Sequence, residues 1–332
     1  MEIKSFLGKP RRFLKKLDNY INTYLSPDSK ASLWAIRGKM VLAKKLYGID
    51  YPDYFQCRCD QASFHQLSQI VPLKEQVKLW LQVNPATSRI NLQDKYRAFL
   101  HFRDYYQRDV AFVNDKESED EFKSFCFSHS EFLVKPLTGR CGRGIQLICT
   151  GEKSFNIDGF LDSYPDGFVA EELIKQDPIL SKLHPESVNT VRINTVNYGE
   201  YIEVKWPCLR IGCGKSIVDN AGAGGVFGAI DPTTGMITDV SDEFHHTFSE
   251  HPDTRIHLIG FHVPKWKEAC EMAITLAGMI PDCHFVGWDL ALTDKGWVMV
   301  EGNHMPIIMY QIATGKGIRK EFLEMKRRLL KK

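Results

Sequence analysis

The sequence predicts an α+β fold in which a mostly helical N-terminal region precedes antiparallel hairpins with interspersed helices. Apolar residues recur at helical spacing through the first 50 positions. From about residue 131, short apolar runs alternate with turn sequences, as they do in hairpins. This order lacks the regular strand–helix repeat of a TIM barrel or a Rossmann domain. The chain of 332 residues is 43% hydrophobic and 25% charged, which is a globular composition and excludes wholesale disorder.

Three regions follow from this pattern. Residues 1–90 form the helical region, with helices within 1–50 and at 74–82 and an irregular remainder. Residues 91–168 form a first lobe: a helix over 91–106 that begins at Asn91, a strand at 131–136, a glycine-rich turn and a strand at 144–150.

Residues 169–332 form a second, larger lobe. A strand at 167–174 leads into it, and two long strands follow, joined by a turn at 197–199. An amphipathic helix over 264–280 then precedes a hairpin that turns at 294–296. A basic helix ends the chain.

Charge is distributed unevenly along the chain. The net charge is only +2, which argues against a nucleic-acid binder, yet residues 1–16 carry +5 and residues 316–332 carry +6. Both ends also have apolar residues at helical spacing. Two interpretations stay open: helices docked on the acidic body, or helices that rest on an anionic membrane surface at the inner face.

Several site types are excluded. The nine cysteines are an odd number in a long chain without a secretory leader, which predicts reduced thiols in the cytoplasm. Cys57, Cys59 and His65 lack a second ligand pair at zinc-site spacing. The chain has no P-loop, no G-x-S-x-G and no H-E-x-x-H motif.

A glycine-rich loop follows the strand that ends near Lys135. In "VKPLTGRCGRGIQLI", three glycines and two arginines lie within seven residues. Glycines let backbone N–H groups approach phosphate oxygens, and the cations supply charge. The alternative is a basic turn on the surface.

The last hairpin, "VGWDLALTDKGWVMVEGN", carries a candidate metal site. Glu301 and Asn303 lie two apart on one strand and therefore on one face, and Asp289 lies nearly opposite Glu301 on the other strand. Three oxygen ligands suit Mg²⁺ shared with phosphates. The alternative is an ordinary surface hairpin. His304 is a candidate for substrate contact, although a lone histidine is more often structural.

Two arginines lie on the long strands between these motifs, Arg192 in "NTVRINT" and Arg210 in "CLRIG". An arginine in an apolar strand needs an anionic partner to be buried. A nucleoside triphosphate or a substrate carboxylate would meet that need.

The ordered set of these motifs resembles the ATP-grasp superfamily over residues 91–310. Within it, "SVNTVRI", "LRIG", "VDNAGAGG" and "GWDLALT…VEGN" look most like the sugar-transfer-associated ATP-grasp family. The resemblance implies two α+β lobes that clasp ATP. It also implies ADP-forming ligation through an acyl phosphate.

The resemblance implies roles for individual residues. Lys135, and more loosely Lys95, resemble the lysines that contact the nucleotide. The loop over the phosphates corresponds to Thr138, Gly139, Arg140, Gly142 and Gly144. The strand whose backbone reads adenine corresponds to Glu171, Glu172, Leu173 and Ile174, with Asp177 a candidate for the ribose. Arg192 and Arg210 resemble the arginines beside the γ-phosphate and the acyl phosphate, and Asn220 lies in the loop that closes on the intermediate. The magnesium ligands correspond to Asp289, Glu301 and Asn303.

These roles predict an ATP- and Mg²⁺-dependent ligase that joins a carboxylate to an amine. The family association suggests a uronic acid of a surface polysaccharide as the carboxylate and an amino acid as the amine. Two alternatives stay open: a kinase that phosphorylates a hydroxyl in the same cradle, and a nucleotide-binding module without turnover.

Overall fold

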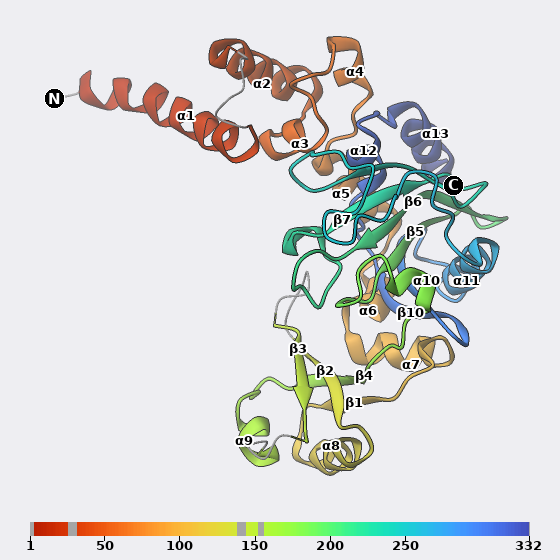
Figure 1. The fold of residues 1–332 in the computed structure, drawn as a ribbon. Coiled ribbons are helices and arrows are strands. Elements are labelled where there is room, and N and C mark those ends of the chain that lie inside the picture. Colours follow the sequence, from red (N-terminus) through yellow and green to blue (C-terminus); the bar gives the residue numbers. More distant parts are fainter. Residues whose placement is uncertain (1–2, 26–31, 138–143, 152–155, 332) are drawn as a thin grey trace.

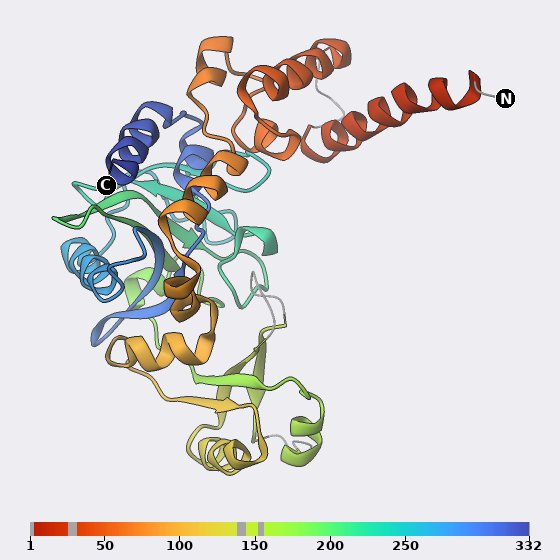
Figure 2. The same ribbon diagram turned by 180° about the vertical axis from the view of Figure 1, so that it is seen from behind.

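In the computed structural model, the described residues are 3–25, 32–137, 144–151 and 156–331. The helices within residues 3–69 lie at one end of the molecule, a six-stranded sheet in the middle and a four-stranded sheet at the other end (Figure 1; Figure 2 from behind). The predicted α+β class, with its helical N-terminal region, is confirmed.

The described part of the N-terminal region contains six helices. Ser63 begins one of them with a capping box: its hydroxyl accepts the N–H of Gln66 while the Gln66 side chain accepts the N–H of Ser63. The segment 51–90 is more helical than the sequence indicated, because such short helices depend on caps and packing. The helices are α1 (Ile3–Tyr24), α2 (Leu33–Tyr47), α3 (Tyr51–Gln56), α4 (Phe64–Gln69), α5 (Leu73–Val83) and α6 (Ala86–Gln93).

The four-stranded sheet has the order β1-β4-β2-β3, and all neighbours are antiparallel. Its strands are β1 (Val110–Val113), β2 (Glu131–Pro136), β3 (Gln146–Cys149) and β4 (Phe168–Glu172). Alternate residues such as Phe132, Val134 and Phe168 pack against α8 (Lys116–Ser128) and α9 (Ile157–Asp162). The intervening residues therefore face the other way.

The six-stranded sheet is antiparallel, in the order β10-β9-β5-β6-β7-β8. The strands are β5 (Thr190–Asn197), β6 (Ile202–Ile211), β7 (Val226–Ile230), β8 (Ile237–Ser241), β9 (Phe285–Thr293) and β10 (Gly296–Asn303). Both predicted strand pairs are present, whereas the sequence did not indicate β7 and β8. Ala269, Ala273 and Leu276 of α11 (Trp266–Gly278) join the core of this sheet.

The helix predicted to begin at Asn91 begins later. Asn91 lies inside α6, and the carboxylate of Asp94 caps α7 (Lys95–Tyr106) by accepting the N–H groups of Tyr96 and Arg97. Leu92, Phe102 and Tyr106 belong to the core of the six-stranded sheet. The core thus includes residues from the predicted first lobe, while the division at residues 90 and 168 stays a prediction.

The C-terminal helix α13 (Arg319–Leu330) packs on the body. Phe322, Met325 and Leu329 are buried in one cluster with Trp80 and Phe285. This packing agrees with the docked interpretation for that end of the chain. Two short helices, α10 (Pro178–Ser181) and α12 (Met309–Thr314), and the 3-10 turn η1 (Ala221–Ala223) complete the elements.

Candidate functional site

Four adjacent strands, β6, β5, β9 and β10, bring the predicted arginines and carboxylates together. Arg192 lies directly opposite Asp289, and Asp289 lies directly opposite Glu301, across the β5–β9 and β9–β10 pairs. The predicted placement of Asp289 beside Glu301 is therefore confirmed. Directly opposed residues point to the same face of a sheet, so these three side chains share one face.

Asp289 is held by both arginines. The Arg192 guanidinium donates from Nε and Nη2 to its two oxygens, the latter contact being 2.8 Å, and Arg210 Nη1 lies 3.2 Å from Oδ2. Burial alone would raise the pKa of Asp289, but the charges of Arg192 and Arg210 hold that pKa below its usual value. The carboxylate is thus kept ionised.

A second carboxylate, Asp219, shares Arg210. Arg210 Nη2 lies 2.9 Å from Asp219 Oδ1, and the Thr190 hydroxyl donates to Asp219 Oδ2 at 2.5 Å. Burial alone would lower the pKa of Arg210, but the charges of Asp219 and Asp289 outweigh this effect and raise that pKa above its usual value. Neither Thr190 nor Asp219 was predicted to have a role. For Asp219, the available signal was its place in the motif "VDNAGAGG".

Glu301 differs from Asp289 because its carboxylate has no hydrogen bond or ion pair within the described ranges. It lies on the edge strand β10 and is exposed. Desolvation and the negative charge of Asp289 raise the pKa of Glu301, while the charges of Arg192, Arg210 and Lys135 act against this rise. Asn303 Nδ2 lies 3.3 Å from Asp289 Oδ2. One unpaired carboxylate beside another carboxylate and an amide is a donor set that fits Mg²⁺.

The four-stranded sheet contributes Lys135 and Glu171, which share the face turned away from α8 and α9. Lys135 Nζ lies 2.7 Å from Glu171 Oε1, and Arg108 Nη2 lies 2.7 Å from Glu171 Oε2. Burial would raise the pKa of Glu171, but the charges of Lys135 and Arg108 lower it to about 2. The side chain of Glu171 therefore fixes the position of Lys135.

Arg108 is a residue that the sequence analysis missed. It is buried, and its Nη1 donates to the carbonyl oxygen of Met299 on β10 at 2.7 Å. Its guanidinium also lies over the Tyr106 ring, 4.4 Å from the centroid. Arg108 thus joins Glu171 of the small sheet to the backbone of the large sheet. The short apolar run "VAFV" directly after it was the signal for a strand at this place.

Lys95 links helix α7 to the end of β2. It lies at the start of α7, and its Nζ donates to the carbonyl oxygens of Pro136 and Leu137 at 3.0 and 3.3 Å. Burial lowers the pKa of Lys95, although the nearby charge of Glu301 opposes this. Lys95 thus lies beside the end of the strand that carries Lys135. The name charged cluster is used for the ionisable residues of this region: Lys95, Arg108, Lys135, Glu171, Arg192, Arg210, Asp219, Asp289 and Glu301.

The remaining predicted residues lie in varied places. β4 ends at Glu172, so Leu173 and Ile174 lie in the connection between the sheets rather than in a strand. The carboxylate of Asp177 caps α10 by accepting the N–H of Ile179. The carbonyl oxygen of Asn220 accepts the N–H groups of Ala223 and Gly225 in the turn that follows it.

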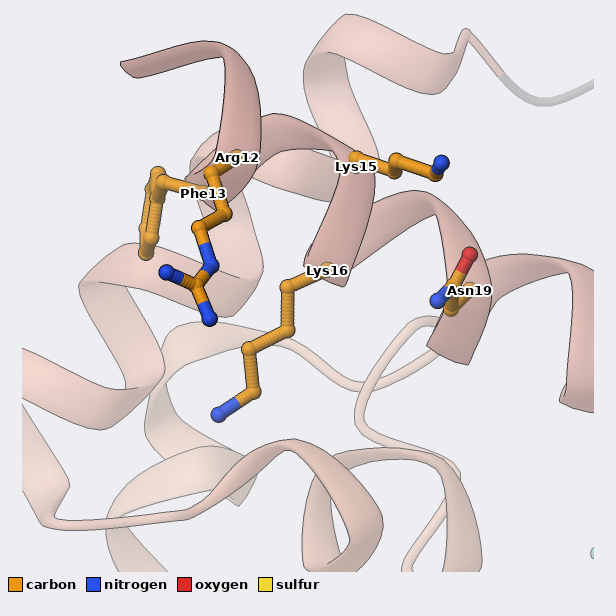
Figure 3. A pocket seen from close by; sticks show the side chains of 5 residues that line it. All are labelled: Arg12, Phe13, Lys15, Lys16 and Asn19. Carbon is orange, nitrogen blue, oxygen red and sulfur yellow. The ribbon is translucent and has the colours of Figure 1, made fainter. Parts of the chain in front are cut away.

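Four loop residues, Thr138, Gly139, Arg140 and Gly142, lie outside the described residues. Gly144, which precedes β3, is exposed and has a φ of 78°, a conformation that favours glycine. His304 contacts Gln93, with 3.0 Å between the Nε2 atoms. A surface pocket on α1, lined by Arg12, Phe13, Lys15, Lys16 and Asn19, belongs to a different part of the chain (Figure 3).

Comparison with known proteins gives one family match. A model of the sugar-transfer associated ATP-grasp family matches residues 76–327. No curated protein sequence matches the chain.

Solved structures with a similar fold are ligases with low identity to this chain. The D-Ala:D-Ser ligase VanG from Enterococcus faecalis is 15% identical, with 74% of this chain and 63% of that chain covered and a TM-score of 0.48. The D-alanine-D-alanine ligase from Helicobacter pylori is 12% identical, with coverages of 74% and 64% and a TM-score of 0.47. The ATP-grasp ligase PsnB, in complex with a minimal precursor, Mg and ADP, is 12% identical, with 74% of this chain and 62% of that chain covered and a TM-score of 0.43. This chain thus spans less than two thirds of the length of PsnB.

Proposed function

Because the chain belongs to the sugar-transfer associated ATP-grasp family, we propose that it is an ATP-dependent ligase that joins a carboxylate to an amine and releases ADP and phosphate. The observation that carries this proposal is the charged cluster, in which the Lys135–Glu171–Arg108 group of the small sheet is joined through Met299 to β10, the strand that carries Glu301 opposite Asp289. Cations from both sheets lie there beside carboxylates that suit a divalent metal. Phosphoryl transfer needs this combination, since its catalysis rests on positioning and charge.

The residues that would hold the nucleotide come from both sheets. Lys95 and Lys135 would contact phosphates, with the loop Thr138–Gly144 above them and the segment Glu171–Ile174 beside adenine, and Asp177 is proposed for the ribose. Asp289, Glu301 and Asn303 would hold Mg²⁺. When bound, this ion neutralises charge on the β- and γ-phosphates.

Arg192 and Arg210 would stabilise the transferring phosphoryl group. A substrate carboxylate oxygen attacks the γ-phosphorus, and the bond from that phosphorus to the β-phosphate oxygen breaks to release ADP. An amine nitrogen then attacks the acyl carbon, phosphate leaves and the nitrogen loses a proton to solvent. Asn220 would orient the acyl phosphate. Asp219 keeps Arg210 in place for both steps through its 2.9 Å contact.

The substrates that we propose are a uronic acid or a similar carboxylate of a surface polysaccharide and an amino-acid amine. The description of the family as sugar-transfer associated supports the first choice. Two rivals remain: a kinase that phosphorylates a hydroxyl, and a module that only binds the nucleotide. The intact charged cluster favours turnover over the module.

One incubation distinguishes these activities. The protein is mixed with ATP, Mg²⁺ and hydroxylamine, together with each member of a panel of carboxylic acids. A ligase yields ADP and a hydroxamate, because hydroxylamine traps the acyl phosphate. A stable phosphoester with ADP would indicate the kinase instead, and release of AMP would contradict both.

We also propose a peripheral contact with an anionic membrane at the cytoplasmic side, through the N-terminal end alone. The C-terminal helix is less suited, because its apolar side chains Phe322, Met325 and Leu329 are buried against the body. Two of its cations are also engaged: Arg319 lies 3.0 Å from Glu75, and Arg328 lies over the Tyr198 ring.

A further inference from the structure

Helix α2 is apolar on two opposite sides. Ile36, Met40 and Ala43 are buried against the neighbouring helices. On the other side, Trp34 is 71% exposed, and Leu42 and Leu46 are 42 and 59% exposed. A surface helix of a soluble protein normally presents polar residues on its outer side.

The exposed residues form a continuous strip rather than scattered positions. Trp34, Gly38, Leu42 and Leu46 follow one another at intervals of four, so they lie on one ridge of the helix, named the α2 ridge. Single exposed apolar residues are common, but a contiguous strip marks a surface that contacts something apolar. Gly38 has no side chain that would shield the strip.

The charges around the α2 ridge identify the partner. Helix α2 contains four basic and no acidic residues. Two of its cations are paired, Arg37 with Asp18 and Lys44 with Asp50. Among the described residues, Lys45 has no ion pair.

The neighbouring helix α1 adds more cations, and its Asp18 joins it to α2 through Arg37. Arg12, Lys15 and Lys16 are exposed and have no ion pair in the described part of the chain. In Figure 3, Arg12 and Lys16 extend on one side of the helix, next to the 43% exposed Phe13. Apolar side chains on α2 and cations on α1, two helices joined by the Arg37–Asp18 pair, complement an anionic lipid surface, whose phosphates attract the cations while its acyl chains accept the apolar groups.

We infer that the α2 ridge inserts into the boundary between headgroups and acyl chains of an anionic membrane, with the cations of α1 at the lipid phosphates. Trp34 suits this boundary because its indole has an apolar body and a polar N–H. No helix among the described residues could cross a bilayer, so the contact is on the surface. Both helices lie at the end of the molecule opposite the four-stranded sheet (Figures 1 and 2). Membrane binding through these helices therefore does not cover the charged cluster.

This inference gives the proposed membrane contact its surface and does not depend on the ligase chemistry. The test is sedimentation of the full chain with vesicles of phosphatidylcholine, with and without phosphatidylglycerol. The key variant is Leu42→Ser/Leu46→Ser. Its matched control is Leu81→Ser/Leu100→Ser, which changes leucines that are 50 and 54% exposed on α5 and α7. Since all four leucines are exposed, both variants should keep the thermal unfolding midpoint of the unchanged protein.

The unchanged protein should bind the anionic vesicles. Its affinity for them should fall about tenfold or more in the α2 variant and by less than about twofold in the control variant. Arg12→Gln/Lys15→Gln/Lys16→Gln should weaken binding and reduce its dependence on salt.

Absence of binding to anionic vesicles at low salt would overturn the inference. Equal loss in the control variant would do the same. Light scattering supplies the other contrary outcome: a dimer of this chain that disappears in the α2 variant would make the ridge a self-association surface. The hydroxamate assay is independent of all these results, so a failed ligase assay leaves the membrane test intact.

Discussion

On the six-stranded sheet, the charged side chains are neighbours because adjacent strands carry them at matching positions. Thr190 lies opposite Arg210, and Arg192 lies opposite Asp289. The Lys135–Glu171 pair also joins adjacent strands, β2 and β4, but a second contact of Glu171 is of another kind: its partner Arg108 precedes β1 and is anchored on Met299 of the other sheet. The first arrangement is fixed by the hydrogen-bonded register within one sheet. The second depends on how the two sheets are placed against each other, so a single substitution should disturb it more.

The largest expected effect is on catalysis. Glu301→Gln should lower turnover at least about 100-fold, because it removes a negative charge from the proposed metal site, while ATP binding survives in part. ADP release and nucleotide titration measure the two effects. Near-normal turnover with Mg²⁺ would remove Glu301 from the metal site and would weaken the role given to the large sheet.

The comparison of the two sheets is tested most directly at Arg108. Arg108→Met leaves the buried Glu171 with one cation, and the free energy of unfolding should fall by about 3–5 kcal/mol. ATP should also bind more weakly, since Lys135 loses its fixed partner. Denaturant unfolding and nucleotide titration check the two effects.

The matched control is Arg37→Met, which breaks the more exposed pair with Asp18. Its expected loss is about 0–1 kcal/mol. Similar losses for both arginines would mean that the Arg108 contact is an ordinary ion pair.

The pH dependence of stability should report on the contact of Glu171 with Lys135 and Arg108. The folded-state pKa of Glu171 is about 2, below its ordinary value of 4.5, so its stabilising effect is present above pH 4.5 and is lost as the pH falls toward 2. The stability of the unchanged protein should therefore decline more steeply over this range than that of Glu171→Gln. Urea midpoints at several pH values measure both slopes, and parallel slopes would show that Glu171 is not held by its cations.

The smallest effect is expected at Thr190. Thr190→Val removes the hydroxyl that donates to Asp219, but the backbone N–H of residue 190 still donates to the same carboxylate at 3.0 Å. Turnover should fall by only about 3–10-fold. A loss as large as that of Glu301→Gln would show that the register of the sheet alone does not hold Arg210 in place.

The sequence by itself determined the parts of the site that lie in one continuous segment. The hairpin of β9 and β10 was predictable because both strands and their turn are adjacent in the chain, so alternation and a glycine at the turn place Asp289 opposite Glu301. The motifs around Lys135, Arg192 and Arg210 could also be recognised from residue type and spacing.

Only the tertiary structure decided which of these groups meet. Arg192 and Asp289 are 97 residues apart in the chain, and their contact exists because β5 and β9 are neighbours in the sheet. Arg108 pairs with Glu171 across 63 residues through the order of the small sheet. Such long-range pairs depend on the packing of whole sheets, which leaves no periodic pattern in the local sequence. The start of α7 at Asp94 instead of Asn91 has a similar cause, since both residue types can cap a helix and the packing of Leu92 and Phe102 selects between them.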